Sequence, residues 1–278
     1  MQNNWFKNIG LIVLVIIVSI LTIKFSGSTA GIGQNLVAEK VISSGEIKIG
    51  YIIYNPMLYK DSGGNLTGFS YDIVEEAAKR LGLKTKWVEE VGWGTAIEGL
   101  KTGRYDIMGT QLWANTSRAR EAVFSIAIIN SVMYPYARVG DARFKDLSKI
   151  NSKDVTIVTA DGDLAVNIAK EDYPLAKLVT LSESSPISDR FLDIADGKAD
   201  ITIIDPASPN LYIKNNPGKI ERISDIPVRT FGNSYTFARG EESMVSMWNV
   251  ALQELLNDGT VAKTMEKYHI SNDFVINK

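Results

Sequence analysis

Between residues 46 and 204 the sequence alternates short apolar segments typical of strands with amphipathic segments typical of helices. In the first unit, residues 47–53 form the predicted strand, a glycine-rich turn follows at 61–65, and Ser70 is the predicted cap of a helix that Gly82 ends. Strands that alternate with helices favour a mostly parallel sheet, so the alternation predicts an α/β fold.

The later units repeat this pattern in two separate sets. The first set continues with strands at 84–89 and 105–108 and a helix at 95–102. A second set begins after Arg138 and ends with a strand at 200–204 and a turn at Asp205-Pro206. It consists of strands 155–159, 178–181 and 200–204 and helices that begin near 164 and 187, and the chain closes with a strand at 233–238, a helix at 241–256 and a tail helix after 259.

Ligands of open parallel sheets bind outside the carboxyl ends of the strands. Six polar or aromatic residues of the first set follow strand ends and are therefore expected around one mouth: Tyr54, Trp93, Thr110, Gln111, Trp113 and Arg118. A guanidinium matches the two oxygens of a carboxylate, so Arg118 is a candidate carboxylate anchor. Trp93 is more often a core residue in such a pattern than a binding wall.

The N-terminus carries an uncharged apolar run at 9–23, with Lys7 before it and Lys24 behind it. This run is typical of a secretory signal, and small residues favour a cut after Ala30; an uncleaved membrane anchor is the alternative. In both alternatives the rest of the protein is exported. A linker is expected at 31–44, before the first strand. The chain has no cysteine, which excludes disulfides, thiol chemistry and a lipid-attachment cysteine.

Composition argues against several other classes of protein. The net charge is −2 and no basic block occurs, so nucleic acid is not an expected partner. The single histidine, His269, lies in the tail without a second metal-ligating residue at a suitable spacing. Nucleophile-elbow, phosphate-loop and zinc-protease motifs are absent from the sequence, so no cofactor, no metal site and no enzymatic activity are expected.

Four segments, in this order, resemble the amino-acid branch of the periplasmic solute-binding proteins, the family 3 extracellular receptors of ABC importers. Residues 66–73 resemble a Gly-Phe-x-x-Asp signature, and residues 97–106 resemble a helix followed by Gly-x-x-Asp. Residues 197–200 together with Asp205, and residues 256–260, match the second lobe and the closing helices. The resemblance covers residues 46–268.

This resemblance implies a two-lobe periplasmic-binding-protein fold of type II, in which each lobe is a mostly parallel sheet flanked by helices. It implies a first lobe at 45–137 and 232–278 and a second lobe at 138–231. Two hinge crossings, near 136–140 and 228–233, would let the lobes close on a ligand.

The resemblance also implies roles for individual residues. Arg118 would hold the α-carboxylate of an amino acid, and Asp205 in the other lobe would receive its ammonium group. Thr110, Gln111 and Trp113 would contact the ligand, and Tyr54 and Trp93 would shape the site. Where the family offers hydroxyls at a helix start, this chain has Asp161 and Asp163, which are either helix caps or a pair that faces a cation.

The expected function is therefore that of a monomeric receptor, periplasmic or extracellular, that binds a small zwitterion and delivers it to an ABC importer permease. The resemblance does not favour a basic ligand side chain, because the family's binders of cationic amino acids carry an acid in the loop after the first strand and residues 51–54 contain none. Two alternatives keep the fold: a sensor anchored in the membrane by residues 9–23, and an exported lyase in which Asp163 or Glu121 donates a proton.

Overall fold

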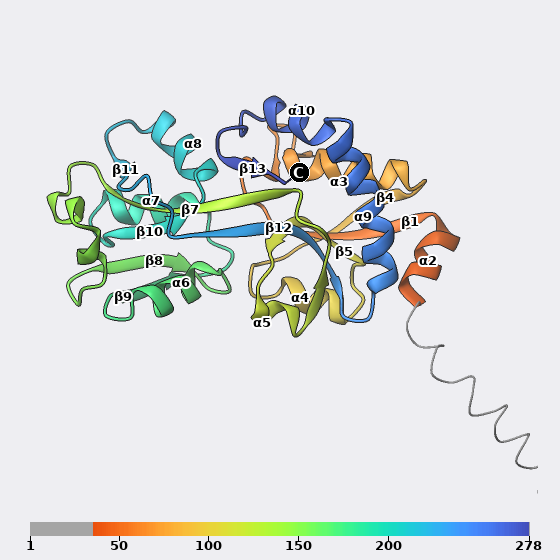
Figure 1. Ribbon diagram of the computed structural model, residues 1–278, viewed down its shortest axis with the longest axis horizontal. Helices are drawn as coiled ribbons and strands as arrows, with labels where there is room; N and C mark the ends of the chain where they lie inside the picture. Colours follow the sequence, from red (N-terminus) through yellow and green to blue (C-terminus); the bar gives the residue numbers. More distant parts are fainter. Residues whose placement is uncertain (1–35, 278) are drawn as a thin grey trace, which may run out of the picture.

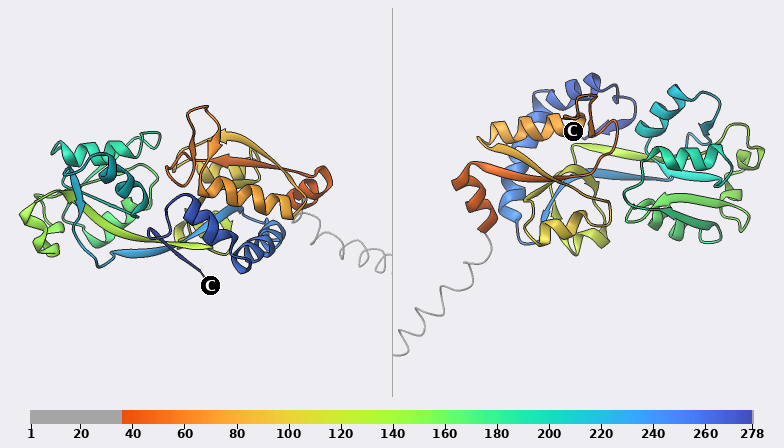
Figure 2. Two further views of the ribbon diagram at one scale, coloured as in Figure 1. Left: turned by 90° about the horizontal axis from the view of Figure 1, so that it is seen from above. Right: turned by 180° about the vertical axis from the view of Figure 1, so that it is seen from behind.

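Two long strands, β7 (Ile129–Arg138) and β12 (Arg229–Ala238), run side by side through the middle of the protein and connect its two lobes (Figure 1). The computed structural model describes residues 36–277. The views from above and from behind show the same two bodies, joined by these strands (Figure 2). The predicted two-lobe α/β fold with two crossings is confirmed.

The lobe that contains the N-terminal strands, called lobe 1, is built on the strand order β4-β1-β5-β12. Strand β1 (Glu46–Tyr51) is parallel to both β4 (Lys84–Glu90) and β5 (Ile107–Trp113), whereas β12 is antiparallel to β5. Shorter elements complete this lobe: β2 (Tyr59–Lys60), β3 (Leu66–Thr67), α4 (Ala96–Lys101), α5 (Thr116–Ala119), β6 (Ala122–Phe124) and β13 (Phe274–Ile276).

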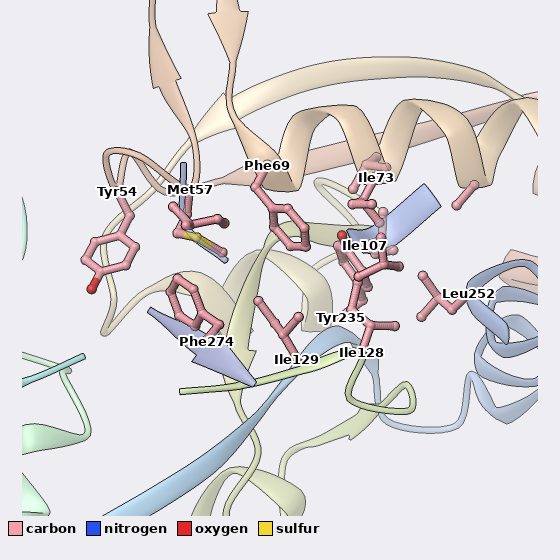
Figure 3. Close-up of a cluster of buried hydrophobic side chains, with 14 of the residues drawn as sticks. Tyr54, Met57, Phe69, Ile73, Ile107, Ile128, Ile129, Tyr235, Leu252 and Phe274 are labelled. Carbon is pink, nitrogen blue, oxygen red and sulfur yellow. The ribbon is translucent and has the colours of Figure 1, made fainter. Parts of the chain in front are cut away.

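The core of lobe 1 lies between its sheet and three helices, α3 (Phe69–Arg80), α9 (Glu242–Asn257) and α10 (Thr260–Lys267). Phe69 and Ile73 of α3 point toward Ile107 and Tyr235 of the sheet (Figure 3). The apolar face of α9 is buried as its spacing predicts, except that Met247 is only half-buried.

The second lobe, called lobe 2, is built on the order β7-β10-β8-β9. Strand β8 (Thr156–Ala160) is parallel to β9 (Lys177–Leu181) and to β10 (Ile201–Ile204), and the end of β7 is antiparallel to β10. The remaining elements are η1 (Ala142–Lys145), η2 (Leu147–Ile150), α6 (Ala165–Asp172), α7 (Ser188–Ala195), α8 (Ala207–Asn215) and β11 (Ile220–Arg222).

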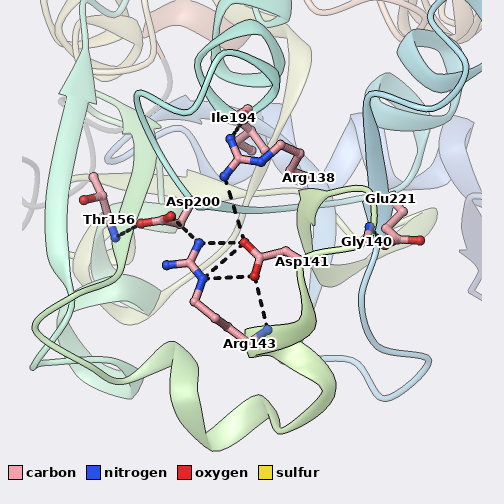
Figure 4. Close-up of polar contacts among 8 residues, drawn as sticks. All are labelled: Arg138, Gly140, Asp141, Arg143, Thr156, Ile194, Asp200 and Glu221. Carbon is pink, nitrogen blue, oxygen red and sulfur yellow. Dashed lines mark hydrogen bonds and ion pairs between the residues drawn. The ribbon is translucent and has the colours of Figure 1, made fainter.

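A cluster of ion pairs fixes the chain where β7 leaves the sheet of lobe 2 (Figure 4). One terminal nitrogen of the Arg143 guanidinium lies 2.6 Å from carboxylate oxygens of both Asp141 and Asp200. Asp200 also accepts from the backbone N–H of Thr156 at 2.8 Å. Arg138 donates to the Ile194 carbonyl at 3.1 Å, so β7 is tied to helix α7.

Several local predictions need correction. The third strand of lobe 1 runs from 107 to 113, so Thr110, Gln111 and Trp113 lie in β5 and not in a loop after a shorter strand. Gly68, not Ser70, is the cap residue of α3, and Ser70 lies inside the helix. Strand β7 was not expected; its Pro135 lacks the N–H that a central strand normally donates.

Residues 36–44, within the expected linker, form helix α2 (Leu36–Ser44), which buries Ala38 and Val41 against lobe 1. The expected signal or anchor at 9–23 lies outside the described residues. In residues 36–277 no helix has the length and apolar character needed to cross a membrane. The exact lobe boundaries at 137/138 and 231/232 stay predictions.

Candidate ligand-binding site

The carboxyl ends of the strands in the two lobes face each other, and the candidate residues lie at these ends. In lobe 1, Tyr54 follows β1, and Gln111 and Trp113 form the last part of β5. In lobe 2, the segment 161–163 follows β8, and Asp205 follows β10. Parallel strands thus bring residues from distant segments to one interlobe region.

Tyr54 and Asp205 connect the two lobes directly. The Tyr54 hydroxyl, which points out of the core of lobe 1 in Figure 3, donates to Asp205 Oδ2 at 2.7 Å. Asp205 Oδ1 accepts from the N–H of Ala207 at 3.2 Å. Asp205 is fully buried, and this burial raises the pKa of its carboxyl to about 6, although the bonds from Tyr54 and Ala207 act in the opposite direction.

Six of the predicted site residues border one small cavity, of about 20 Å³, beside this contact. They are Tyr54, Trp93, Thr110, Gln111, Trp113 and Asp205. Sequence reasoning missed two polar neighbours in the same cavity, Ser70 and Asn233. The sequence predicts a helix cap at Ser70, because serine is common at that position, and no local signal assigns this residue to the site.

Gln111 and Ser70 are the unpaired polar side chains of this cavity. Gln111 is 6% exposed, and neither its Oε1 nor its Nε2 has a hydrogen-bond partner among residues 36–277; Ser70 is fully buried, and its Oγ has no partner in the same part of the chain. Thr110 differs, because its Oγ1 both accepts from the Ile52 N–H at 2.9 Å and donates to the Ile52 carbonyl at 2.7 Å. Thr110 therefore connects β5 to the segment that follows β1 by two hydrogen bonds to the backbone of Ile52.

The two tryptophans of the site are held by packing. The Trp113 ring stacks on Phe231 with a centroid distance of 5.8 Å, and its Nε1 donates to Ser131 Oγ at 3.0 Å. The Trp93 ring meets the Tyr54 ring edge-on at 5.6 Å. Trp93 is half-buried, so it packs on the core and also borders the site. Both rings narrow the cavity.

Arg118 does not border this small cavity. It borders a second cavity, of 240 Å³, together with Asp161 and Asp163. Its guanidinium donates to the Trp113 carbonyl at 3.1 Å and, across the lobes, to the Gly162 carbonyl at 3.2 Å. Burial lowers the pKa of Arg118. The structure thus does not place Arg118 and Asp205 in the same cavity.

The two aspartates after β8 have different surroundings. Asp163 is 8% exposed, and its Oδ2 lies 2.6 Å from the terminal nitrogen of Arg190 on α7, as an ion pair that is not aligned as a hydrogen bond. Its Oδ1 accepts from the N–H of Ala165 at 3.0 Å, near the start of α6. Asp163 therefore both supports a helix start and faces a cation, while Asp161 is exposed. Nothing local in the sequence indicated Arg190.

A second contact between the lobes involves three glycines and Glu183. The Gly94 N–H of lobe 1 donates to Glu183 Oε2 of lobe 2 at 2.8 Å. A Cβ atom on Gly92 would lie 2.4 Å from the Glu183 carboxyl carbon. A Cβ atom on Gly162 would lie 2.2 Å from the Gly94 nitrogen, and Gly162 has a φ of +74°. Only glycine permits this approach of the two backbones.

A much larger cavity, of 1050 Å³, opens beside the small one and shares Tyr54 and Trp93 with it. Glu183, Ser188 and Asn215 of lobe 2 contribute to its polar lining. This volume is at the upper end of the range for small-molecule sites, which is roughly 300–1,000 Å³. The interlobe region therefore has a narrow polar end and a wide end.

The carboxyls that were expected to serve a lyase do not have the required environment. Glu121 is exposed and pairs with Lys101, which lowers its pKa. Asp163 is paired with Arg190. At the small cavity the carboxyl with a raised pKa is Asp205, while Glu241 and Asp273, whose pKa values are also raised, do not border it. In residues 36–277 no group of three or more metal-ligating side chains is present.

Known proteins with similar sequences include both binding proteins and enzymes. The chain is 29% identical over 217 residues to the L-cystine-binding protein TcyA of Bacillus subtilis, a match that covers 77% of each protein. It is also 26% identical over 181 residues to cyclohexadienyl dehydratase of Pseudomonas aeruginosa, covering 64% of this chain and 66% of the enzyme.

A solved structure with a similar fold is a putative binding component of an ABC transporter from Wolinella succinogenes, complexed with lysine. It superposes with a TM-score of 0.72 at 26% identity, over 80% of this chain and 95% of that one. The model of one protein family matches residues 47–271, which is most of the chain. The chain belongs to the bacterial extracellular solute-binding proteins, family 3.

Proposed function

We propose that this protein is an extracytoplasmic receptor that captures a small zwitterion, an amino acid, between its lobes and delivers it to an ABC importer. Family membership and the similarity to a cystine-binding protein support this proposal. In this role the protein acts as a monomer in the periplasm or outside the cell, and its macromolecular partner is the importer permease.

The observation that carries the proposal is the environment of Asp205. Its carboxyl is fully buried between the lobes, and no lysine or arginine within residues 36–277 forms an ion pair with it. A buried carboxylate without a cation is costly, so it favours a cationic group supplied by a ligand. An ammonium group would provide this charge.

Arg118 is proposed as the anchor for the carboxylate of the zwitterion. Its guanidinium donates to two backbone carbonyls, Trp113 O and Gly162 O. A carboxylate is a stronger acceptor than either carbonyl, so a ligand can replace these bonds. The ligand would then connect Arg118 of lobe 1 with Asp205 of lobe 2, as a zwitterion does.

A thermal-shift screen over amino acids, dipeptides, amines and carboxylates tests this function. A ligand at a hundred times its Kd adds about 2.7 kcal/mol of stability, which corresponds to roughly 5–10 °C for a protein of this size. We expect stabilisation by at least one α-amino acid. Stabilisation by amines or carboxylates alone would contradict the proposal.

A lyase is the second candidate, because a relative is cyclohexadienyl dehydratase and Asp205 has a pKa of about 6. Such a carboxyl carries a proton in a useful fraction of molecules near neutral pH and could act as a general acid. Incubating the protein with the compounds that stabilise it, followed by mass spectrometry, distinguishes the two. A receptor returns each compound unchanged.

The N-terminal segment at 9–23 leaves one further alternative, a sensor that stays anchored in the membrane. Mass spectrometry of the mature protein, isolated from its native envelope, identifies its first residue. A start at Gly31 would exclude the anchor, and an intact Met1 or Gln2 start would support it.

A further inference from the structure

The cavity of 1050 Å³ that opens beside the small one, called the wide cavity, is lined by side chains of both lobes. Five charged side chains border it, and four of them are compensated by an ion pair. The pairs are Glu89 with Arg104 at 2.6 Å, Glu90 with Lys60 at 2.7 Å and Arg190 with Asp163 at 2.6 Å. The fifth is Glu183, which forms no ion pair within residues 36–277. The lining of the wide cavity therefore keeps one uncompensated negative charge.

Glu183 presents this charge at the contact between the lobes. Its side chain is half-buried; Oε2 accepts from the Gly94 N–H at 2.8 Å, and Oε1 accepts no hydrogen bond from the described part of the chain. An ionised carboxylate has about four acceptor positions, so most of them are available to a ligand. Because water is partly excluded, the carboxylate attracts a cation more strongly than it would at an exposed site. The loop after β9 thus supplies the acid that residues 51–54 lack.

An aromatic wall lies beside this carboxylate. Trp93 stands in the chain between two glycines that both approach Glu183: a Cβ atom on Gly92 would lie 2.4 Å, and one on Gly94 2.9 Å, from atoms of its carboxylate. The face of an aromatic ring attracts a cation, and tryptophan does so most strongly. The aromatic residues of the lining are Tyr54, Trp93, Phe191 and Tyr212.

The size of the wide cavity favours a large cation over a small one. A primary ammonium group is compact and strongly hydrated, and a cavity of 1050 Å³ leaves room for much of its water. A guanidinium or an alkylated ammonium group is larger and more weakly hydrated, so it gains more from an aromatic wall and a carboxylate together. An anion would be repelled by Glu183.

We infer that the wide cavity is a subsite for a large, weakly hydrated cation at the end of the ligand's side chain, with Glu183 as its counter-ion and Trp93 as its aromatic wall. The ligand is then an α-amino acid whose long side chain ends in a guanidinium or an alkylated ammonium group. Its side chain passes Tyr54 and Trp93, which border both cavities. This inference rests on the proposed function and deepens it.

The experiment compares ligands that differ at the distal end of the side chain, by isothermal titration of the full mature protein. L-arginine is measured beside L-citrulline, which has nearly the same shape without the charge. Nε,Nε,Nε-trimethyl-L-lysine is measured beside L-lysine and L-norleucine, and L-2-aminoadipate is the anionic probe. At least one of the two large cations should bind about 10-fold or more tightly than its neutral counterpart and than L-lysine, and L-2-aminoadipate should bind most weakly. The cation that does so identifies the distal group.

Two variants test the residues themselves through the ratio of the Kd values of neutral and cationic ligand. Glu183→Gln keeps the size of the side chain and can still accept from the Gly94 N–H, but it removes the charge, so the ratio should fall about 10-fold. Trp93→Leu removes the aromatic face and should lower the ratio about 3- to 10-fold. A loss of stability that affects both ligands equally cancels in the ratio.

Glu221→Gln is the matched control. Glu221 also belongs to lobe 2 and also accepts from a glycine N–H, that of Gly140 at 2.7 Å, but it is exposed and does not border the wide cavity. This variant should keep the wild-type ratio, because it loses the same charge away from the ligand.

The outcomes separate this inference from the proposed function. If norleucine, citrulline, lysine or aminoadipate binds as tightly as the large cations, or if Glu183→Gln keeps the wild-type ratio, the inference is overturned and the receptor function stands. A further probe, n-butylguanidinium, lacks the amino-acid end. If it binds in a Glu183-dependent manner and no amino acid binds, the subsite stands and the zwitterion proposal fails. If none of the probes binds, both are wrong.

Discussion

The hydroxyl of Tyr54 in lobe 1 donates to the carboxylate of Asp205 in lobe 2 over 2.7 Å, so the two lobes share a buried hydrogen bond. Together with the Gly94–Glu183 contact, this bond closes the interlobe region and leaves a cavity of only about 20 Å³ at its polar end. An incoming ligand must therefore compete with contacts that the protein makes with itself. The net binding free energy of the ligand is therefore less favourable by the free energy needed to break these contacts between the lobes.

The first prediction concerns the pH dependence of stability. Burial raises the pKa of Asp205 from 3.8 to about 6, so the folded protein holds a proton that the unfolded chain loses. This contribution to stability is complete below pH 4 and is lost as the pH rises to about 6. The rise of the Asp205 pKa by about two units corresponds to a change of at most about 3 kcal/mol in the free energy of unfolding. Denaturant titrations between pH 4 and 7 measure it.

The control for this prediction is Asp205→Asn, which keeps an oxygen for the Tyr54 hydroxyl but does not titrate. Asp273, which lies near Asp205 and also has a raised pKa, titrates in both proteins, so the difference between the two curves isolates Asp205. The variant should gain stability relative to the wild type as the pH rises. Parallel curves would show that Asp205 titrates normally.

Much of this arrangement follows from local sequence patterns. The alternation of apolar strands with amphipathic helices predicted the order of β1, β4, β8, β9 and β10 and of the helices between them. Each of these patterns can be recognised from the residues of a single strand or helix. The strand ends then placed Tyr54 and Gln111 in one region, which needs only the topology rule for parallel sheets. Asp205 lies at the strand ends of the other lobe, and only the family resemblance brought it to the same site.

Other features depend on contacts that no local pattern records. Glu183 lies 89 residues from Gly94, and their hydrogen bond exists only because the lobes are closed. Asp163 forms an ion pair with Arg190 because helix α7, which carries Arg190, packs within the same lobe. Strand β7 contains Pro135, which argues against a central strand, yet its partners β10 and β11 accommodate it. These two contacts and strand β7 could be identified only from the three-dimensional structure.

The second prediction tests the closed contact between the lobes. In Gly162→Ala the new Cβ would lie 2.2 Å from the Gly94 nitrogen, so the closed arrangement cannot form as described. We expect a larger radius of gyration by small-angle scattering and a Kd at least about 10-fold weaker for whichever amino acid binds the wild type.

Gly218→Ala is the matched control for this variant. Gly218 has a φ of +77°, close to the +74° of Gly162, but a Cβ atom on Gly218 would meet no other atom within 4 Å. It carries the same backbone strain without an interlobe clash. If both variants lose stability equally and Gly162→Ala keeps the wild-type dimensions, the contact has no role in closure.

The third prediction separates the two aspartates after β8. Asp163→Asn leaves Arg190 buried and without its counter-charge, which should cost about 3–5 kcal/mol and lower the melting temperature by at least about 6 °C. Asp161→Asn, two residues earlier at an exposed position, should stay within about 0.5 kcal/mol of the wild type. Thermal and denaturant melts compare them; similar small losses in both would refute a structural role for Asp163.

The last prediction concerns the two charged anchors. If Arg118 binds the ligand carboxylate through two parallel hydrogen bonds, Arg118→Lys keeps the charge but loses the fork of donors, so affinity should fall. Arg120→Lys, two residues away at an exposed position, should bind as the wild type does. Asp205→Asn keeps the Tyr54 contact and removes only the charge that faces the ammonium, which should cost at least about 30-fold in Kd.

Isothermal titration of these three variants, with an amino acid that stabilises the wild type, decides between two arrangements of the site. A loss in both Arg118→Lys and Asp205→Asn supports a zwitterion that connects the lobes. A loss in Asp205→Asn alone means that Arg118 stays bound to the Trp113 and Gly162 carbonyls and that the ligand carboxylate binds elsewhere. Wild-type affinity in Asp205→Asn would show that the ammonium binds elsewhere, because a buried carboxylate that contacts it cannot lose its charge without effect.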